Sequence, residues 1–251
     1  MPVKNILFLC AACFCAAVVD AIAGGGGIIS LPAYFLAGIP PYAALGTNKF
    51  SSSIGTTMST YQFIKSGKVN FDIVKFLIPF TLIGSALGVT TILKVNEKYL
   101  QTAVLIMILF VGVYSLFSKT KGIKDNFTGA TKLNLFLGII LAFALGFYDG
   151  FFGPGTGSFL IFGLINIYGF DYIKAGGNAK ILNLASNISA LALFAIHGQI
   201  NYLVGIPCAF TMIFGARLGA KLALKNGVKI IKPIFITMSL AVAVKMLIAI
   251  F

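Results

Sequence analysis

Two aspartates stand directly before glycine clusters at the ends of two apolar segments. Asp20 precedes Gly24–Gly27, and Asp149 precedes the run GPGTG at 153–157. Glycines break a helix and expose backbone N–H groups, so the positive end of the following helix faces an approaching anion. An ionisable residue at membrane depth costs several kcal/mol unless it is paired or hydrated, so both aspartates are candidates for function, including carriage of a coupling proton. The alternative is that both carboxylates only cap the helices that follow. The candidate anion-binding positions in the two clusters are Gly25, Gly26, Gly153, Gly155 and Thr156.

Two lysines form a second constellation. Lys49 ends the tripeptide TNK and Lys180 ends the tripeptide NAK, each at the start of an apolar segment. Amides, hydroxyls and an ammonium that face the interior of a helical bundle suit a small oxyanion. The alternative is that both lysines extend to the membrane interface. The candidate binding residues are Asn48, Lys49, Asn178, Lys180 and Asn183, and the polar faces continue with Ser52, Thr56, Ser186 and Asn187.

Other reactive side chains carry weaker signals. Arg217 interrupts an apolar segment and is a further candidate for the site, where it could pair with either aspartate. His197 stands near a segment end, which favours an interfacial histidine over a proton relay. Cys10 and Cys13 form a CxxC inside an apolar run, which favours packing residues over a redox or metal role. Because the sequence shows no nucleophile with a base, no metal-ligand cluster and no nucleotide motif, we expect neither an enzyme nor a cofactor.

The elements that must position these residues are apolar throughout. Hydrophobic residues make up 59% of the chain, charged residues only 10%, and the mean hydropathy is +0.99. Stretches of about 20 apolar residues match the hydrocarbon thickness as helices, so we predict an all-α polytopic membrane protein. The net charge of +13 comes from basic residues in short connections, which indicates topology signals rather than nucleic-acid binding. The predicted segments are 5–23, 28–38, 45–64, 71–93, 99–117, 133–151, 158–168, 178–197, 201–222 and 230–251.

The segments fall into two sets of five that form an internal repeat. The stretch GKVN…GSALG at 67–88 matches GQIN…GARLG at 198–219. Chance similarity between apolar runs does not explain matched Asp, Asn and Gly. Each set contains a glycine-flanked segment of about 11 residues, too short to cross as a straight helix, so we predict eight long spans and two short segments. Because the aspartate and glycine cluster recurs in mid-chain, we expect residues 5–23 to be retained rather than cleaved as a signal peptide.

The repeat divides the chain into a first transmembrane repeat at 1–117, a basic linker at 118–132 and a second transmembrane repeat at 133–251. If each short segment and its partner complete two crossings, each repeat crosses an odd number of times and the repeats are inverted. If the short segments only re-enter, the repeats are parallel, an alternative that stays open. With the linker in the cytoplasm, most loop lysines lie inside, as the positive-inside rule requires. The cytoplasmic loops would then hold Lys65, Lys68, Lys75, Asp171, Lys174, Lys221, Lys225, Lys229 and Lys232.

Four stretches together resemble a known family. They are DxxxGGGGxxxxP and ALGTNKF in the first repeat, and GFYDGFFGPGTGSFL and GARLGAKLA in the second. On these stretches the chain resembles the TauE/SafE sulfite-exporter family, also called TSUP or DUF81 permeases, over essentially its whole length. The resemblance implies a transporter that moves sulfur-containing oxyanions such as sulfite or organosulfonates out of the cytoplasm. The first repeat has Gly25 and Gly26 where the second has Pro154 and Gly155, so identical roles for the two halves do not follow.

The residues and the resemblance together predict a secondary transporter of the plasma membrane. Its expected substrate is a small sulfur-containing oxyanion, its expected direction is export, and proton coupling at Asp20 or Asp149 is a further hypothesis. The alternatives are a passive anion channel, a permease for small carboxylates, and a membrane subunit that scaffolds an enzyme. The expected partners are the small anion and membrane lipid, without nucleic acid, and the sequence leaves the oligomeric state open.

Overall fold

The computed structural model describes residues 1–100, 106 and 124–226, and every regular element in this part of the chain is an α-helix. The helices are α1 Val3–Ala23, α2 Gly27–Leu36, α3 Pro41–Lys65, α4 Phe71–Ile92, α6 Lys132–Phe151, α7 Thr156–Tyr168, α8 Tyr172–Ile196 and α9 Tyr202–Asn226. Among the described residues, five of these helices (α1, α4, α6, α8 and α9) are long and apolar enough to cross a membrane. The prediction of an all-α polytopic membrane protein is confirmed at this level.

The structure describes three of the remaining predicted segments as helices, and it leaves two largely undescribed. Helix α3 has 25 residues, as many as α8. Its polar side chains lower its hydropathy, so it is not one of the five helices that are apolar enough to cross a membrane. Helices α2 and α7 are the two short apolar helices that the sequence predicts. The predicted spans 99–117 and 230–251, and the first residues of the linker, lie largely outside the described residues.

Glycines with positive φ stand at both helix breaks. Helix α1 stops at Ala23 because Gly24 takes a left-handed φ of 78°, and Gly155 takes a φ of 84° just before α7. These values suit glycine because it lacks a Cβ. The two breaks touch each other: the Ser158 hydroxyl donates to the carbonyl of Ala23 at 2.5 Å, and a Cβ on Gly24 would overlap the backbone of Gly157. The two discontinuities therefore meet at one point of the molecule.

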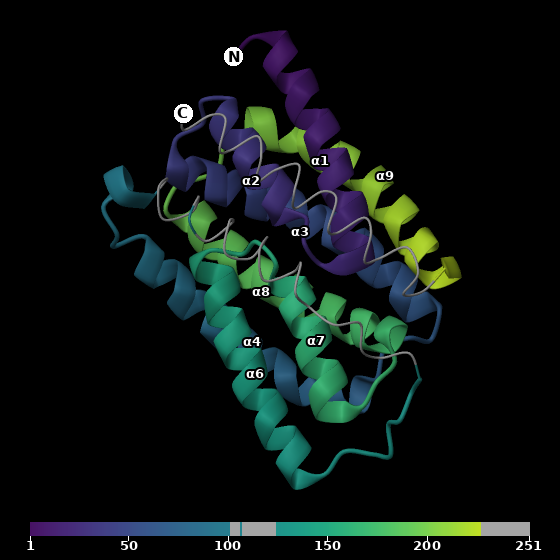
Figure 1. The fold of residues 1–251 in the computed structure, drawn as a ribbon. Helices are drawn as coiled ribbons and strands as arrows, with labels where there is room; N and C mark the ends of the chain where they lie inside the picture. The colour runs from purple at the N-terminus through teal and green to yellow at the C-terminus, as the bar shows by residue number, and fades with distance from the viewer. Residues whose placement is uncertain (101–105, 107–123, 227–251) are drawn as a thin grey trace.

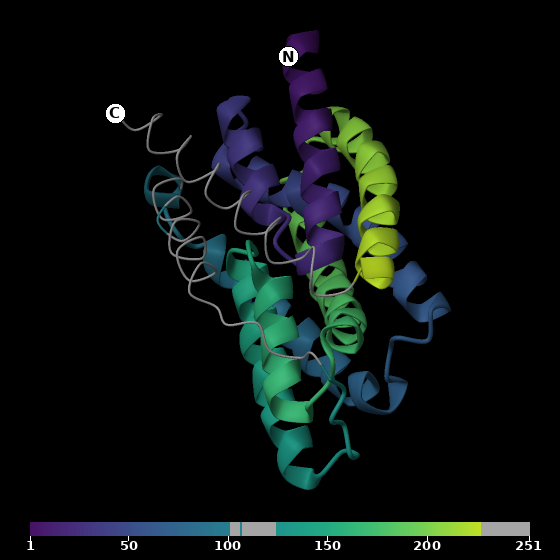
Figure 2. The same cartoon turned by 45° about the vertical axis from the view of Figure 1, so that its right-hand side comes forward.

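The long helices pack in two outer pairs around a central pair. Helix α1 lies along α9 and α4 lies along α6, while α3 and α8 meet between them (Figure 1). Figure 2 shows the same two outer pairs on opposite sides of the centre. Glycines allow the close approach in each outer pair, because a Cβ there would overlap carbonyl oxygens of the neighbouring helix. These glycines are Gly84 and Gly88 on α4, and Gly215 and Gly219 on α9.

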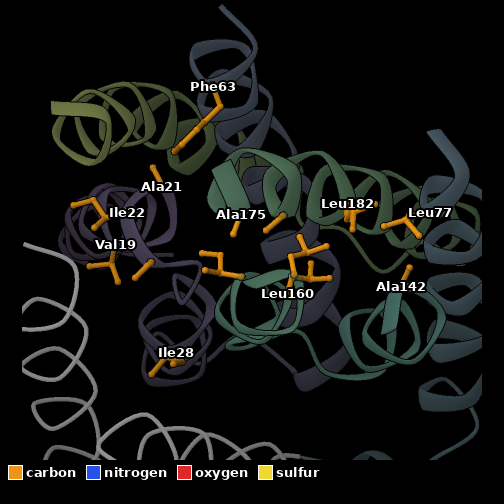
Figure 3. Close-up of a cluster of buried hydrophobic side chains, with 14 of the residues drawn as sticks. Val19, Ala21, Ile22, Ile28, Phe63, Leu77, Ala142, Leu160, Ala175 and Leu182 are labelled. Carbon is orange, nitrogen blue, oxygen red and sulfur yellow. The ribbon is translucent and has the colours of Figure 1, made fainter. Parts of the chain in front are cut away.

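The short helices fill the apolar core between these pairs. Figure 3 shows buried side chains that run from Val19 and Ile22 on α1, past Leu160 on α7, to Leu77 on α4 and Ala142 on α6. The outer surface is also apolar: along α9, Leu203, Ile206 and Phe210 are exposed at a helical spacing. Such a stripe would be unfavourable in water but is the expected surface of a helix that faces lipid.

One contact recurs at matching positions of the two halves. The backbone N–H of Asn70, in GKVN, donates to the Asn178 side chain at 2.8 Å, and that of Asn201, in GQIN, donates to the Thr47 hydroxyl at 2.9 Å. Thr47, rather than Asn48, therefore makes the contact that corresponds to that of Asn178. In each case a side chain of one half satisfies the backbone at the entry to a helix of the other half.

The described end of the linker is attached to the turn between α7 and α8. The Asn126 N–H donates to the carbonyl of Gly169 at 2.8 Å, and Lys174 at the start of α8 pairs with Asp125 at 2.8 Å. The Lys174 ammonium also lies 5.3 Å from the centre of the Phe127 ring. These contacts place residues 124–127 beside the beginning of α8.

Candidate functional site

A buried ion pair joins the two halves of the chain at the centre of the molecule. Lys49 on α3 donates to the Asp149 carboxylate at 2.6 Å, and the two side chains are only 5% and 3% exposed. The same ammonium donates to the Asn187 side chain of α8 at 2.9 Å. An unpaired charge at this depth would be costly, so the carboxylate and the amide are what make a buried lysine tolerable here.

A second ion pair joins the halves the other way round, with its lysine in the second half of the chain and its aspartate in the first. Lys180 on α8 donates to the Asp20 carboxylate at 2.6 Å and also to the backbone carbonyl of Asp20. The Lys180 side chain is 2% exposed, but Asp20 is 22% exposed. Each aspartate at a helix break is thus paired with the lysine of the other half, and the two pairs together are electrically neutral.

Between the two breaks lies a small polar cavity of about 40 Å³. By volume it would hold on the order of three water molecules. Carboxylate, ammonium, amide and hydroxyl groups share its wall with glycines of both breaks, and α1 and α9 close it with small or apolar side chains. The cavity is lined by Ala16, Ala17, Asp20, Gly24, Gly26, Gly27, Asn48, Lys49, Ser52, Gly55, Thr56, Asp149, Gly153, Gly157, Asn183, Asn187, Met212 and Ala216.

Seven residues proposed from sequence line this cavity. They are Asp20, Gly26, Asn48, Lys49, Asp149, Gly153 and Asn183. The position of Asn48 is set by Ser30 on α2, whose hydroxyl donates to the Asn48 side chain at 2.6 Å. These residues come together because α3, with Lys49, faces the break that follows α6, and α8, with Lys180, faces the break that follows α1.

The other predicted site residues lie outside the cavity wall in this conformation. Asn178 accepts the N–H of Asn70 and donates to the carbonyl of Lys174, so both ends of its amide are occupied. The Thr156 hydroxyl donates to the carbonyl of Gly153 at 2.8 Å, and Gly155 precedes α7 as its N-cap. Gly25 and Lys180 also stand outside the wall, and Lys180 reaches the site only through Asp20.

The structure also decides between alternatives that the sequence left open. Among the described residues, the Asp20 and Asp149 carboxylates accept hydrogen bonds from Lys180 and Lys49 and none from a backbone N–H of α2 or α7, so they hold the lysines rather than cap these helices. Arg217 pairs with neither aspartate and lies in a separate hollow. Extension to the membrane interface does not describe Lys49 or Lys180, because both lysine side chains are buried and both ammonium groups end on aspartates inside the protein.

Sequence reasoning did not single out every residue of the wall. Asn187 was noted on a polar helix face, but its role as the second acceptor for Lys49 was not predicted. Its spacing of four residues from Asn183 is the signal that could have found it, because such residues share a helix face. Met212 and Ala216 on α9 line the cavity as well, and their apolar side chains carry no signal of this role.

Comparison with known proteins decides the family. The profile described as Sulfite exporter TauE/SafE matches residues 9–246. The chain belongs to the TauE/SafE family. Among its relatives, a probable membrane transporter protein of Haemophilus influenzae is 38% identical over 234 residues, which cover 93% of this chain and 91% of the relative. No solved structure matches the chain significantly.

Two further TauE/SafE relatives agree in name and length. The probable membrane transporter protein ORF9 of Sinorhizobium sp is 35% identical over 96% of this chain and 92% of its own length. The probable membrane transporter protein YfcA of Escherichia coli K12 is 34% identical over 92% of this chain and 86% of its own length. Together with the apolar helices, these matches identify a multi-pass membrane transporter of this family.

Proposed function

We propose that the protein is a secondary transporter of the plasma membrane that exports a small sulfur-containing oxyanion. The observation that carries this proposal is the buried Lys49 ammonium, shared between Asp149 and Asn187 in a polar cavity between two helix breaks. An ammonium with amide neighbours and nearby helix N-termini is suited to an oxyanion. The family description as a sulfite exporter supports the substrate class.

Anion binding is proposed to compete with Asp149 for Lys49. The two ion pairs already neutralise the site, and Asp149 occupies the Lys49 ammonium that an oxyanion would use. A bound anion would add uncompensated negative charge in a low-dielectric environment. Protonation of Asp149 offsets one unit of that charge and frees Lys49, so one proton accompanies each anion.

This coupling is compatible with export. A divalent oxyanion that moves with one proton still carries one net negative charge across the membrane. An inside-negative potential then favours outward movement by about 2.3 kcal/mol per 100 mV. The anion's own outward gradient adds to this driving force.

The architecture proposed for this transport is a pair of inverted repeats, residues 1–117 and 133–251, joined by a cytoplasmic linker at 118–132. The exchanged ion pairs and the recurring Asn70 and Asn201 contacts support it. Movement of one repeat against the other would open the cavity to each side in turn. Within this arrangement Lys49 contacts the substrate, whereas Lys180 holds Asp20 in position from outside the cavity wall.

Uptake by proteoliposomes of the purified protein tests the proposed function. The panel contains sulfite, an organosulfonate, thiosulfate, sulfate and a small carboxylate. We expect saturable uptake of at least one sulfur oxyanion and none of the carboxylate. Transport of the carboxylate alone would refute the substrate class, and flux that rises linearly with concentration without countertransport would indicate a channel.

Replacing Asp149 with asparagine should abolish the dependence of transport on the proton gradient. In the wild type, the proton carried by Asp149 is proposed to free Lys49 for the anion, so a proton gradient should affect transport. Asparagine resembles the protonated carboxyl at every pH, so affinity should be high and independent of pH. The measurement is anion uptake and binding as a function of pH, with an imposed pH gradient. Undiminished gradient dependence in the variant would remove Asp149 from the coupling step.

A further inference from the structure

A second hollow lies apart from the polar cavity between the two helix breaks. It is found where the C-terminal halves of α3 and α9 run side by side. It has a volume of about 520 Å³. Four of the six residues in its wall are cations, and none is acidic. We call it the basic basin, lined by Gln62, Lys65, Arg217, Lys221, Leu224 and Lys225.

The cations of the basin lack protein partners within the described part of the chain. Lys65, Arg217, Lys221 and Lys225 make no ion pair there, whereas Lys49, Lys180, Lys174 and Lys75 each have an aspartate. Lys65 and Lys225 lie in the last turns of their helices, where basic residues are favourable next to the helix C-terminus. That explanation does not extend to Arg217, which lies more than two turns before the end of α9.

Exposed apolar and aromatic side chains border the basin on both helices. On α9, Phe214 is 52% exposed and Leu218, beside Arg217, is 44% exposed. On α3, Tyr61 and Ile64 are exposed in the same way. A cationic hollow between apolar stripes near two helix ends matches a phospholipid, whose phosphate and acyl chains would meet the two kinds of surface. A freely dissolved phosphate would use only the first of them.

We propose that the basic basin binds the phosphate of an anionic phospholipid, with Arg217 as the main contact. The planar guanidinium can donate two parallel hydrogen bonds to a phosphate, and Lys65 and Lys221 add charge around it. The hollow is large enough for a headgroup and is built from α3 and α9, both of which also line the transport cavity. A lipid held there would tie the two helices together at their C-terminal ends.

The test uses the full-length protein in phosphatidylcholine nanodiscs with and without phosphatidylglycerol. Native mass spectrometry counts retained phosphatidylglycerol, and thermal unfolding reports its stabilising effect. We expect phosphatidylglycerol to be retained and to raise the Tm of the wild type. The triple variant Lys65→Gln, Arg217→Gln, Lys221→Gln should bind it on the order of 100-fold more weakly, since each cation contributes about 1 kcal/mol.

A matched control removes three exposed lysines elsewhere, Lys75→Gln, Lys124→Gln and Lys132→Gln, and should leave retention unchanged. If the triple variant does not fold, Arg217→Lys preserves the charge but removes the paired donors, and it should still weaken retention. Equal retention in the wild type and these basin variants, or equal loss in the matched control, would overturn the proposal. A Tm increase with inorganic phosphate in detergent that equals the phosphatidylglycerol effect would assign the basin to free phosphate and overturn the lipid assignment.

Discussion

Replacing Lys49 with methionine should reduce anion uptake by at least about 100-fold. The ammonium is the cation in the cavity wall, and it is held by Asp149 at 2.6 Å and Asn187 at 2.9 Å. In the proposed complex Lys49 pairs with the anion, and truncating one partner of a buried, hydrogen-bonded charge pair costs about 2–5 kcal/mol, of which 2.8 kcal/mol already corresponds to a factor of 100. The measurement is initial uptake by proteoliposomes at matched protein content.

Two further variants separate lost binding from lost folding. The single change leaves Asp149 buried without its partner, so some protein could be lost through instability. The double variant Lys49→Met, Asp149→Asn removes both charges and should fold, yet it still lacks the binding cation. Uptake should therefore stay low in the double variant, while Lys75→Met, at an exposed ion pair, should leave it unchanged. Near-normal uptake in a folded double variant would exclude Lys49 as the anion-binding residue.

Replacing Lys180 with methionine should instead destabilise the protein, because it leaves Asp20 without its cation. The Asp20 side chain keeps 22% exposure and borders a polar cavity, so the cost should lie near about 2–3 kcal/mol, below that of a fully buried pair. For a chain of this size that corresponds to a Tm decrease of roughly 5–10 °C. Thermal unfolding in detergent measures it.

The double variant Lys180→Met, Asp20→Asn provides the test of a positioning role. It removes both charges, so most of the lost Tm should return, which a double-mutant cycle would report as coupling between the two residues. Uptake by the double variant should change far less than in the Lys49 variants, because Lys180 lies outside the cavity wall and asparagine at position 20 keeps a polar side chain in it. A double variant as inactive as Lys49→Met would show that the Lys180 and Asp20 pair takes part in transport directly.

The sequence predicted the composition of the site better than its pairing. Asp20, Asp149, Lys49 and Lys180 were singled out because charged residues in apolar segments require partners, and the structure brings all four to the two helix breaks. Which lysine meets which aspartate could not be predicted, since each half offers one of each at equivalent places. Only the packing of α3 and α8 between the outer pairs decides that the partners are exchanged.

Helical geometry explains why some predicted residues stand outside the cavity. Asn178 precedes Lys180 by two residues, which is about 200° around a helix, so the two side chains face different neighbours. Arg217 follows Ala216, and the turn of about 100° between them separates the cavity wall from the basic basin. Sequence patterns place residues on a helix. Which face of α3 or α9 meets the cavity depends on how the two helices pack, and the amino-acid composition does not specify that packing.

The exchanged ion pairs also set the order of events during synthesis. Asp149 follows Lys49 by 100 residues, and Lys180 follows Asp20 by 160. At about 5–20 residues per second, Lys49 is synthesised roughly 5–20 s before Asp149. Neither ion pair can therefore form until the chain has been translated to Asp149 or to Lys180. A nascent chain that terminates in the linker would present a lysine and an aspartate without their native partners to the proteases that survey the membrane.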